Sequence, residues 1–295
     1  MNFRQFSLNS QILRGIDELG FVNPTPIQEQ AVLPAIEGKD VLGLAQTGTG
    51  KTAAFVIPIL QRLTIPSSKS GVRFLVLVPT RELAQQIYTA FLDLGKYMKI
   101  QCVTIYGGVS KFPQLSGIRK GAQIVVACPG RLLDHMEQGD IDLSNIDVLV
   151  LDEADTMCDM GFIPSIRRIL NNLPDNRQTL LFSATMPTVI RSLVMKLLKN
   201  PVTVQIGAIA PARTVSHAIY PVPDKLKKNL IIALLNQTST GQVLVFARTK
   251  HRARILAFDL AAKSFKVAAL QGNMTQNARK QAMDGFRSGK INVLV

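Results

Sequence analysis

The sequence predicts an α/β protein built on doubly wound parallel sheets, and two observations carry this prediction. Short apolar runs rich in Val, Ile and Leu alternate with longer amphipathic stretches, which is the order of strands and helices in α/β folds. The runs are continuous rather than alternating, as expected for strands buried on both faces of a parallel sheet. The strand candidates of the first two hundred residues are VLGLA (41–45), FLVLVP (74–79), CVTIY (102–106), QIVVACP (123–129), VLVLDEAD (148–155), TLLFSAT (179–185) and VTVQI (202–206).

The pattern divides the chain into two parts. Helices are expected between the strands, for example over 80–98 and 164–173, whereas residues 208–214 carry small residues and a proline without apolar periodicity. The alternation restarts with runs at 215–222, 243–249, 267–272 and 291–295 and helices near 225–237, 251–263 and 276–287. We therefore expect a domain over 1–207, a linker over 208–214 and a partial second domain over 215–295. The final run ends on Val295 without a turn or polar tail, so we expect C-terminal truncation rather than a short native edge strand.

Composition excludes several classes of protein. Apolar residues make up 47% of the 295 residues, which is enough for sizeable cores. No apolar run approaches the roughly 18 residues of a membrane span, and the N-terminus has no signal-peptide pattern. The three cysteines and three histidines are scattered without zinc-site spacing. We expect a cytoplasmic protein, away from membranes; the sequence does not fix the oligomeric state, and a monomer is the expectation.

The net charge of +14 is unevenly distributed along the chain. Residues 1–207 hold 20 basic and 17 acidic side chains, whereas residues 208–295 hold 14 basic and 3 acidic side chains, a net charge of +11. Such a bias favours a polyanionic partner, because each neutralised phosphate releases condensed counterions. A basic surface without a specific partner is the alternative.

The segment AQTGTGKT (45–52) predicts a phosphate-binding loop between a strand and a helix. Its glycines let backbone N–H groups turn towards the β- and γ-phosphates, while the lysine supplies a positive charge and the last threonine a hydroxyl for Mg²⁺. Ala45 stands where the motif has its first glycine. The alternative is a Gly/Thr-rich turn with a surface lysine. The candidate nucleotide-binding residues are Thr47, Gly48, Thr49, Gly50, Lys51 and Thr52.

The run VLVLDEAD (148–155) delivers two carboxylates to the carboxyl end of a strand, where ligand sites of such sheets lie. We expect Asp152 to hold Mg²⁺ with Thr52, and Glu153 to orient or deprotonate the attacking water, so that Lys51, Asp152 and Glu153 form the catalytic set. An acidic helix N-terminus, favoured by the helix dipole, is the alternative for this segment taken alone.

Together with these segments, GFVNPTPIQ (20–28), PTRELAQQ (79–86) and SAT (183–185) resemble motifs of the DEAD-box RNA helicases, in that family's order. The resemblance implies two RecA-like domains, the second incomplete. It implies that Gln28 reads adenine, for which an amide that both donates and accepts is suited, and that Phe3 stacks on the base. It also implies that Asp155, Ser183 and Thr185 couple the nucleotide state to strand separation.

The same resemblance assigns RNA contacts to both domains. Gly107–Gly108 fits the family's GG element, CPGR (128–131) the TPGR element, VLVFARTKH (243–251) motif IV, and LQGNMTQNAR (270–279) the H-G-D-x-S-Q-x-x-R segment. Cys128, Gln271 and Asn273 depart from the family pattern, and Cys128 is equally well interpreted as core filler. The implied RNA-binding residues are Thr80, Arg81, Gly108, Arg131, Arg248, Gly272 and Arg279.

The resemblance implies an ATP-dependent RNA helicase that uses ATP and Mg²⁺ and holds RNA by its backbone, with little sequence preference. Motifs V and VI, the latter with the arginine finger, do not occur in the 295 residues, so we expect the chain to bind ATP but hydrolyse it poorly. An ATP-gated RNA clamp or annealing factor is the alternative. A P-loop ATPase unrelated to RNA is a third hypothesis, against which the three added segments argue.

Overall fold

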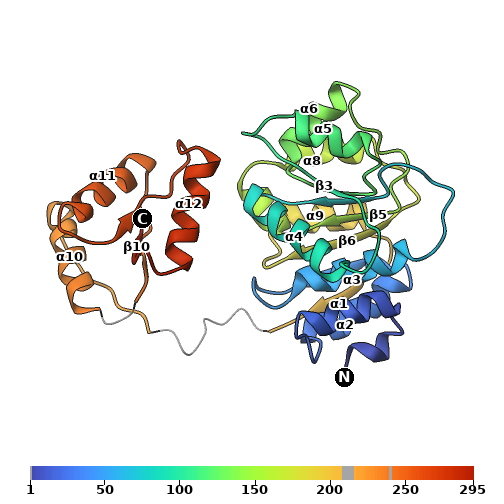
Figure 1. Cartoon of the computed structure of the whole chain (residues 1–295), viewed down its shortest axis with the longest axis horizontal. Helices are drawn as coiled ribbons and strands as arrows, with labels where there is room; N and C mark the ends of the chain where they lie inside the picture. The colour runs from blue at the N-terminus through green and yellow to red at the C-terminus, as the bar shows by residue number, and fades with distance from the viewer. Residues whose placement is uncertain (1, 208–215, 239–240) are drawn as a thin grey trace. The chain divides into compact units, whose positions relative to one another are not determined.

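The structure is a computed structural model that describes residues 2–207, 216–238 and 241–295. The chain divides into two compact units, Met1–Ala210 and Pro211–Val295. The predicted linker over 208–214 lies outside the described residues. Each unit is described by itself (Figure 1).

The first unit is built on a sheet of seven strands in the order β3-β4-β2-β5-β6-β1-β7, with every described pairing parallel. All seven predicted strands are present, and the predicted α/β class is confirmed. The strands β2, β4, β5 and β6 are buried along their whole length, as their uninterrupted apolar sequences require. The bounds are β1 Val41–Leu44, β2 Phe74–Leu77, β3 Cys102–Ile105, β4 Ile124–Ala127, β5 Val148–Leu151, β6 Gln178–Ser183 and β7 Val202–Gln205.

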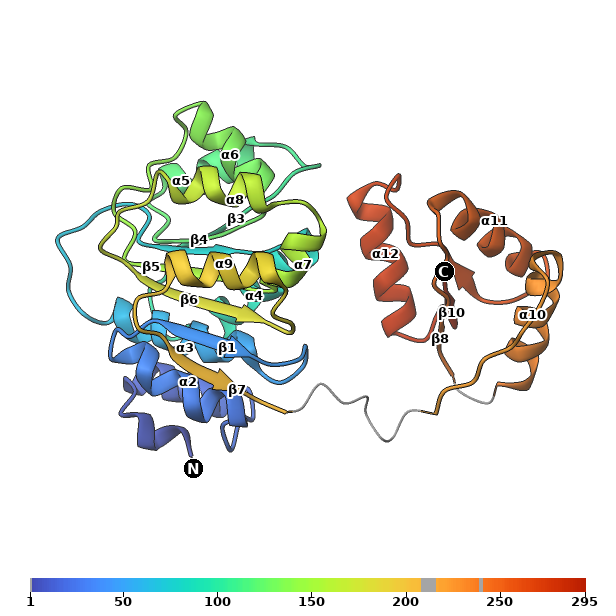
Figure 2. The same cartoon turned by 180° about the vertical axis from the view of Figure 1, so that it is seen from behind.

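Helices cover both faces of this sheet and create two apolar cores (Figures 1 and 2). Successive strand residues contribute to opposite cores: Val148 and Val150 pack on one side, Leu149 and Leu151 on the other. Helices α1 to α4 pack into the first core, whereas α6 to α9 pack into the second. The bounds are α1 Ser10–Glu18, α2 Pro26–Ile36, α3 Lys51–Leu63, α4 Arg81–Leu94, α5 Phe112–Arg119, α6 Pro129–Glu137, α7 Ala154–Asp159, α8 Ile163–Leu170 and α9 Thr188–Leu197, with a 3-10 turn at Phe3–Phe6.

The strand order brings three candidate segments together. In the sheet, β5, β6 and β1 are neighbours. Because parallel strands end at the same edge, the loops after these strands, which carry DEAD, SAT and the glycine-rich turn, meet there. Figure 2 shows the loop after β1, the tip of β6 and α7 on this one side of the unit.

The second unit contains a parallel sheet in the order β8-β10-β9, flanked by α10 to α12. The expected run over 215–222 is not a strand: its described part, 216–222, has no regular structure. Pro221 lacks the N–H that a ladder needs, and Ile219 is almost fully exposed. The bounds are α10 Lys227–Gln237, β8 Val243–Leu244, α11 Lys250–Ala261, β9 Val267–Ala268, α12 Gln276–Arg287 and β10 Val293–Leu294, with a 3-10 turn at Asp224–Leu226.

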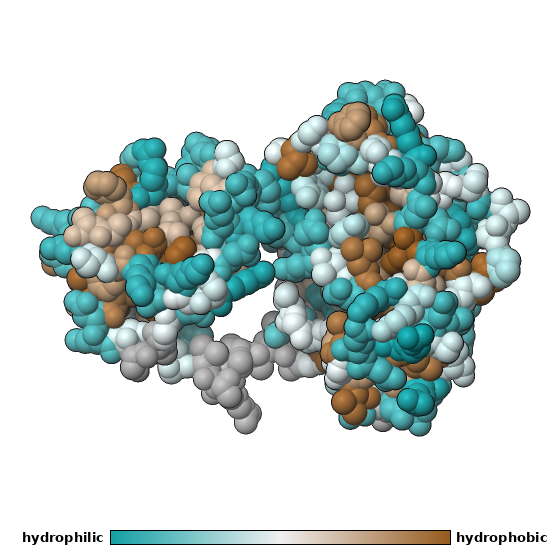
Figure 3. All heavy atoms as spheres, viewed as in Figure 1, coloured by the Kyte–Doolittle hydropathy of each residue, from teal (hydrophilic) through white to brown (hydrophobic). Residues whose placement is uncertain are grey.

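The second unit has a small core and much exposed apolar surface. Its fully packed side chains are few and lie mainly on α11 and β10. Leu244, Phe246 and Phe258 are exposed, and apolar residues gather on the face of this unit that Figure 3 shows. Across the described parts of the chain, none of the helices combines the length and apolar character needed to cross a bilayer.

We predict that Gly15→Ala destabilises the first unit by about 1–3 kcal/mol, the range expected for overpacking a close helix contact. A Cβ atom at Gly15 of α1 would lie 2.3 Å from the backbone oxygen of Leu94 in α4, and backbone cannot move aside cheaply. Gly130→Ala in α6 is the matched control, since a Cβ there meets nothing within 4 Å. Urea unfolding of both variants checks this prediction, and equal midpoints for Gly15→Ala and the unsubstituted chain would contradict it.

Candidate nucleotide site and nucleic-acid interface

The glycine-rich turn joins β1 to α3 with two residues in the left-handed region of backbone space. Gly48 has a φ of +86° and Gly50 a φ of +93°, values that glycine adopts without strain. A Cβ atom at Gly50 would also lie 2.5 Å from the side-chain nitrogen of Gln28. The Thr49 hydroxyl donates to the carbonyl of Gln46 (2.7 Å) and closes the turn, whereas the side chain of Thr47 is exposed.

Lys51 opens helix α3 and is buried, with 6% of its surface exposed. Its ammonium donates to the carbonyl of Ala45 (3.0 Å) at the start of the same loop. An ammonium has three donors, so this bond leaves capacity for an anion. The N-terminal N–H groups of α3 favour negative charge at the same place. Thr52 follows in the first turn of α3 and is half-buried.

The two carboxylates after β5 differ in environment. Asp152 is 2% exposed and accepts the backbone N–H of Glu153 (2.9 Å). Glu153 is half-buried and has φ 50° and ψ 50°, a left-handed conformation that costs a non-glycine residue about 1–2 kcal/mol. Strain of this kind concentrates at functional sites, where the surrounding structure holds it in place.

Electrostatics connect the loop to the carboxylates. Burial raises the pKa of Asp152 to about 6, while the Lys51 ammonium and the N–H of Glu153 act in the opposite direction. The ammonium of Lys51 is therefore close enough to act on the charge of the carboxylate after β5. The positive charge of a metal ion or a further cation would favour the ionised form of Asp152 in the same way.

The two residues expected to contact the base lie in different surroundings. Gln28 is 4% exposed; its oxygen accepts the N–H of Thr25 (3.0 Å) and its nitrogen donates to the carbonyl of Gly50 (3.0 Å). Gln28 therefore contacts the phosphate loop directly. Phe3 is 3% exposed and packs edge-on against Phe6 at 6.0 Å between ring centroids. Base stacking on Phe3 stays a prediction, and it would require the ring to leave this packing.

A side-chain network joins the DEAD and SAT segments. One carboxylate oxygen of Asp155 accepts both the N–H and the hydroxyl of Thr185, each at 2.8 Å. The hydroxyl of Ser183 donates to the carbonyl of Thr185 (2.7 Å). Burial raises the pKa of Asp155, but the hydrogen bonds that its carboxylate accepts, the two from Thr185 foremost, outweigh burial and hold the pKa below its ordinary value.

The expected RNA-binding residues of the first unit come from three loops and helix starts. Thr80 caps α4 by accepting the N–H of Leu83 (3.2 Å), and Arg81 follows it. A Cβ atom at Gly108, whose φ is +75°, would lie 2.3 Å from the guanidinium of Arg81, so that guanidinium rests on the glycine. Arg131 in α6 donates to the carbonyl of Val109 (3.1 Å). Arg81, Gly108 and Arg131 thus gather around one loop.

Cys128 occupies the position before α6 without forming a side-chain cap. The side chain belongs to the first core, and burial raises the pKa of its thiol to about 12. A neutral, packed thiol agrees with the interpretation of Cys128 as core filler.

The remaining expected contacts belong to the second unit. Arg248 and Gly272 are exposed, and Arg279 is half-buried in α12. The two departures from the family pattern are bonded to each other: the N–H of Asn273 donates to the side-chain oxygen of Gln271 (2.8 Å). The side-chain oxygen of Asn273 in turn accepts a hydrogen bond from the ammonium of Lys250 (3.0 Å).

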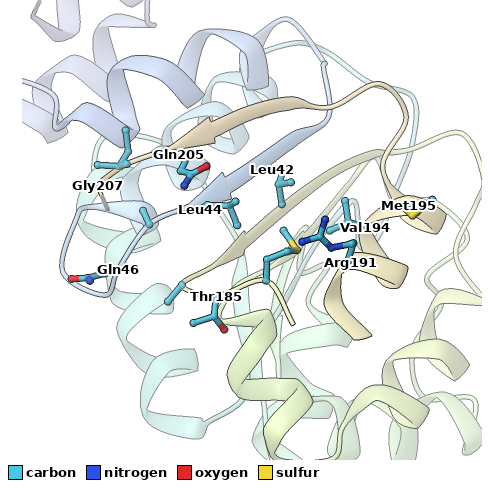
Figure 4. A pocket seen from close by; sticks show the side chains of 13 residues that line it. Leu42, Leu44, Gln46, Thr185, Arg191, Val194, Met195, Gln205 and Gly207 are labelled. Atoms are coloured by element: carbon cyan, nitrogen blue, oxygen red, sulfur yellow. The ribbon is translucent and has the colours of Figure 1, made fainter. Parts of the chain in front are cut away.

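A groove of about 400 Å³ opens beside the phosphate loop (Figure 4). Leu42 and Leu44 of β1 form part of its wall, and both belong to the α9 side of the sheet, opposite α3. The groove therefore lies next to the predicted nucleotide position rather than within it. Its other lining residues are Ala45, Gln46, Ala184, Thr185, Met186, Arg191, Val194, Met195, Gln205, Ile206 and Gly207.

The sequence did not predict the structural role of Gln114. Gln114 is buried, and its nitrogen donates to the carbonyls of Tyr106 (3.2 Å) and Ser110 (3.1 Å), which holds the Gly107–Gly108 loop from behind. A glutamine in an amphipathic helix ordinarily faces solvent, so only its position six residues after Gly108 could have drawn attention to it.

Comparison with known proteins identifies related chains. The sequence model described as DEAD/DEAH box helicase matches residues 25–193, and the one described as Helicase conserved C-terminal domain matches residues 226–295. The chain is 42% identical to the ATP-dependent RNA helicase DeaD of Mycobacterium tuberculosis and 40% identical to that of Escherichia coli, each over 99% of this chain. It covers 52% and 47% of those proteins, so it spans about half the length of the curated relatives it matches.

A solved structure shows the same fold over the whole chain. The crystal structure of a DEAD box protein from the hyperthermophile Methanococcus jannaschii matches with a TM-score of 0.67 and 33% sequence identity. The match covers 100% of this chain and 79% of that one.

We predict that Thr185→Val lowers the free energy of unfolding by about 1 kcal/mol at neutral pH, the usual contribution of one hydrogen bond. Valine removes the hydroxyl bond to Asp155 and keeps the backbone bond. Because the folded-state pKa of Asp155 is depressed, its contribution to stability is present above the unfolded-state pKa and is lost as pH falls through the folded-state value. Denaturation at several pH values should show the difference closing in acid; Ser192→Ala in α9, which removes another exposed hydroxyl bond (3.1 Å), is the control. A pH-independent difference would contradict the prediction.

Proposed function

The chain belongs to the DEAD/DEAH box helicase family, and from this premise we propose that it acts as an ATP-dependent RNA helicase. The proposed activity couples ATP binding and hydrolysis to local separation of an RNA duplex held by its backbone. The observation that carries the proposal is that the buried Lys51 and the buried Asp152 follow β1 and β5, two parallel strands whose carboxyl ends lie at the same edge of one sheet.

The nucleotide is proposed to bind with its phosphates at the turn before α3. The backbone N–H groups of this turn and of the first turn of α3 face the phosphates, and Lys51 provides the balancing charge. Gln28 retains one further amide hydrogen and one further lone pair, which suit N7 and N6 of adenine. Because Gln28 also holds Gly50, recognition of the base would be transmitted to the loop that holds the phosphates.

The hydrolysis roles follow from the two environments of the carboxylates. Glu153 is the more exposed of the pair, and its backbone adopts a left-handed conformation. We assign it to orienting the attacking water and accepting its proton. Asp152, fixed by the N–H of Glu153, keeps negative charge next to Lys51.

The donor set fits Mg²⁺. A magnesium ion in a phosphate site is held by one or two carboxylates together with phosphate oxygens and waters, and here the buried carboxylate of Asp152 and the hydroxyl of Thr52 are available. Consistently, the described residues contain no group of three or more His, Cys, Asp or Glu that could cage an ion by themselves. When bound, the ion would supply charge neutralisation at the β- and γ-phosphates.

RNA is proposed to contact both units. In the first unit the contacts come from Thr80, Arg81, Gly108 and Arg131, where the missing side chain of Gly108 makes room for the guanidinium of Arg81 that would hold a phosphate. In the second unit the residues are Arg248, Gly272 and Arg279, within a segment of net charge +11. Contacts of this type read shape and charge rather than base sequence.

We predict that Lys51→Ala weakens ATP binding at least about tenfold, because a buried charge-assisted contact contributes about 1.5–3 kcal/mol. Glu153→Gln should leave ATP affinity within about twofold and slow hydrolysis by about a hundredfold or more, the contribution of a general base. Calorimetric ATP binding, together with phosphate release in the presence of single-stranded RNA, measures both effects. Equal losses of binding in the two variants would refute the assignment of roles.

The alternative is an ATP-gated RNA clamp or annealing factor without productive unwinding, because the same sequence motifs serve both activities. A strand-displacement assay separates the two activities. An RNA affinity that rises with ATP, without displacement of a short duplex, supports the clamp. RNA binding that is indifferent to ATP contradicts both proposals.

A further inference from the structure

The loop from Tyr106 to Phe112 is held rigidly although most of it is exposed. Gln114 bonds two of its carbonyls from behind, and Arg131 bonds a third at Val109 (3.1 Å). At its far end, the N–H of Phe112 donates to the hydroxyl of Ser110 (3.2 Å). A loop fixed by this many side-chain bonds presents its surface in one conformation, which lowers the entropic cost of binding a ligand.

This loop presents an aromatic ring to solvent. Phe112 is 75% exposed, and it belongs to none of the apolar cores of the described residues. A single exposed apolar side chain is common and needs no explanation by itself. Here, however, the ring stands four residues from Gly108, on which the guanidinium of Arg81 rests.

The charges around the ring favour a polyanion. Arg131 contacts the same loop and is paired with Asp134 at 3.5 Å, and the ammonium of neighbouring Lys111 donates to the neutral side chain of Gln138 (2.8 Å). A fixed aromatic ring among cations is the arrangement with which proteins bind single-stranded nucleic acid, since the cations hold phosphates and the ring stacks on a base.

We propose that Phe112 is a stacking platform for one unpaired nucleobase of the RNA whose phosphates contact Gly108 and Arg131. This inference rests on the RNA binding proposed above and extends it from the backbone to a base. Stacking does not distinguish bases, because every base has a π-face. The site therefore selects unpaired over paired RNA without selecting a sequence, since a base inside a duplex is covered on both faces.

The chain contains no tryptophan, so Phe112→Trp creates a single fluorescent reporter at the proposed site. We expect an unstructured uridine oligomer to quench this tryptophan, and an abasic ribose-phosphate oligomer of the same length to bind without quenching it. Phe258→Trp is the matched control, because Phe258 is 76% exposed and lies in the second unit. Quenching of both reporters to the same extent would show non-specific contact and overturn the proposal.

Affinity provides the second measurement. We expect Phe112→Ala and Phe112→Leu to weaken the binding of the uridine oligomer about tenfold, within the range of one base–aromatic stack. Affinity for the abasic oligomer and for a blunt duplex should stay within about twofold. Full affinity of Phe112→Leu would overturn the proposal, because an aliphatic contact would then suffice. If the unsubstituted chain binds no RNA, the proposed function falls with it; if it binds and the reporter is not quenched, only the role of Phe112 falls.

Discussion

The nucleotide site depends on two opposite charges held out of water, the ammonium of Lys51 and the carboxylate of Asp152. Burying a charge costs several kcal/mol unless other groups compensate it. Here the compensation is partial: one carbonyl accepts from the ammonium, and one N–H donates to the carboxylate. The hydrogen-bonding capacity that remains on both groups suits a triphosphate and its cation, whose binding would complete what the fold leaves unsatisfied.

Two further contacts connect this site to the neighbouring segments of the first unit. Gln28 is bonded to the backbone of Gly50, which ties the helix that carries Gln28 to the glycine-rich loop. On the other side, Asp155 is bonded to Thr185, which joins the helix after β5 to the segment after β6. Because β5, β6 and β1 are adjacent, the loops that follow these strands are neighbours. A change at the proposed γ-phosphate position would therefore act on both contacts. A sheet with these strands separated could not link the base, the phosphates and the SAT segment so directly.

The sequence predicted the parts of this arrangement that depend on local pattern. Apolar runs located all seven strands of the first sheet. Burial on both faces leaves little freedom in the composition of β2, β4, β5 and β6, whereas the edge strands β3 and β7 are only partly buried. The strand prediction for the run at 215–222 was wrong, because Pro221 interrupts the run and Ile219 and Tyr220 are exposed. The sequence pattern also could not show that Phe3 packs against Phe6, or that the side chain of Gln28 forms two hydrogen bonds within the protein. These contacts depend on which side chains are neighbours in the folded chain. The role of Gln114 could not be predicted for the same reason.

The two units differ in net charge and in the size of their cores. The first has nearly balanced charge, with 20 basic and 17 acidic side chains over residues 1–207, and its binding groups are few, fixed and directional. The second has a small core and a net charge of +11 over residues 208–295, a charge that would attract a polyanion and that salt would screen. A diffuse positive charge attracts a polyanion without orienting it. A loop held by side-chain hydrogen bonds, such as 106–112, can orient a polyanion only after contact. In the first unit the loops after β3, β5 and β1 share one edge of the sheet, so its proposed RNA and nucleotide contacts lie on one side of it.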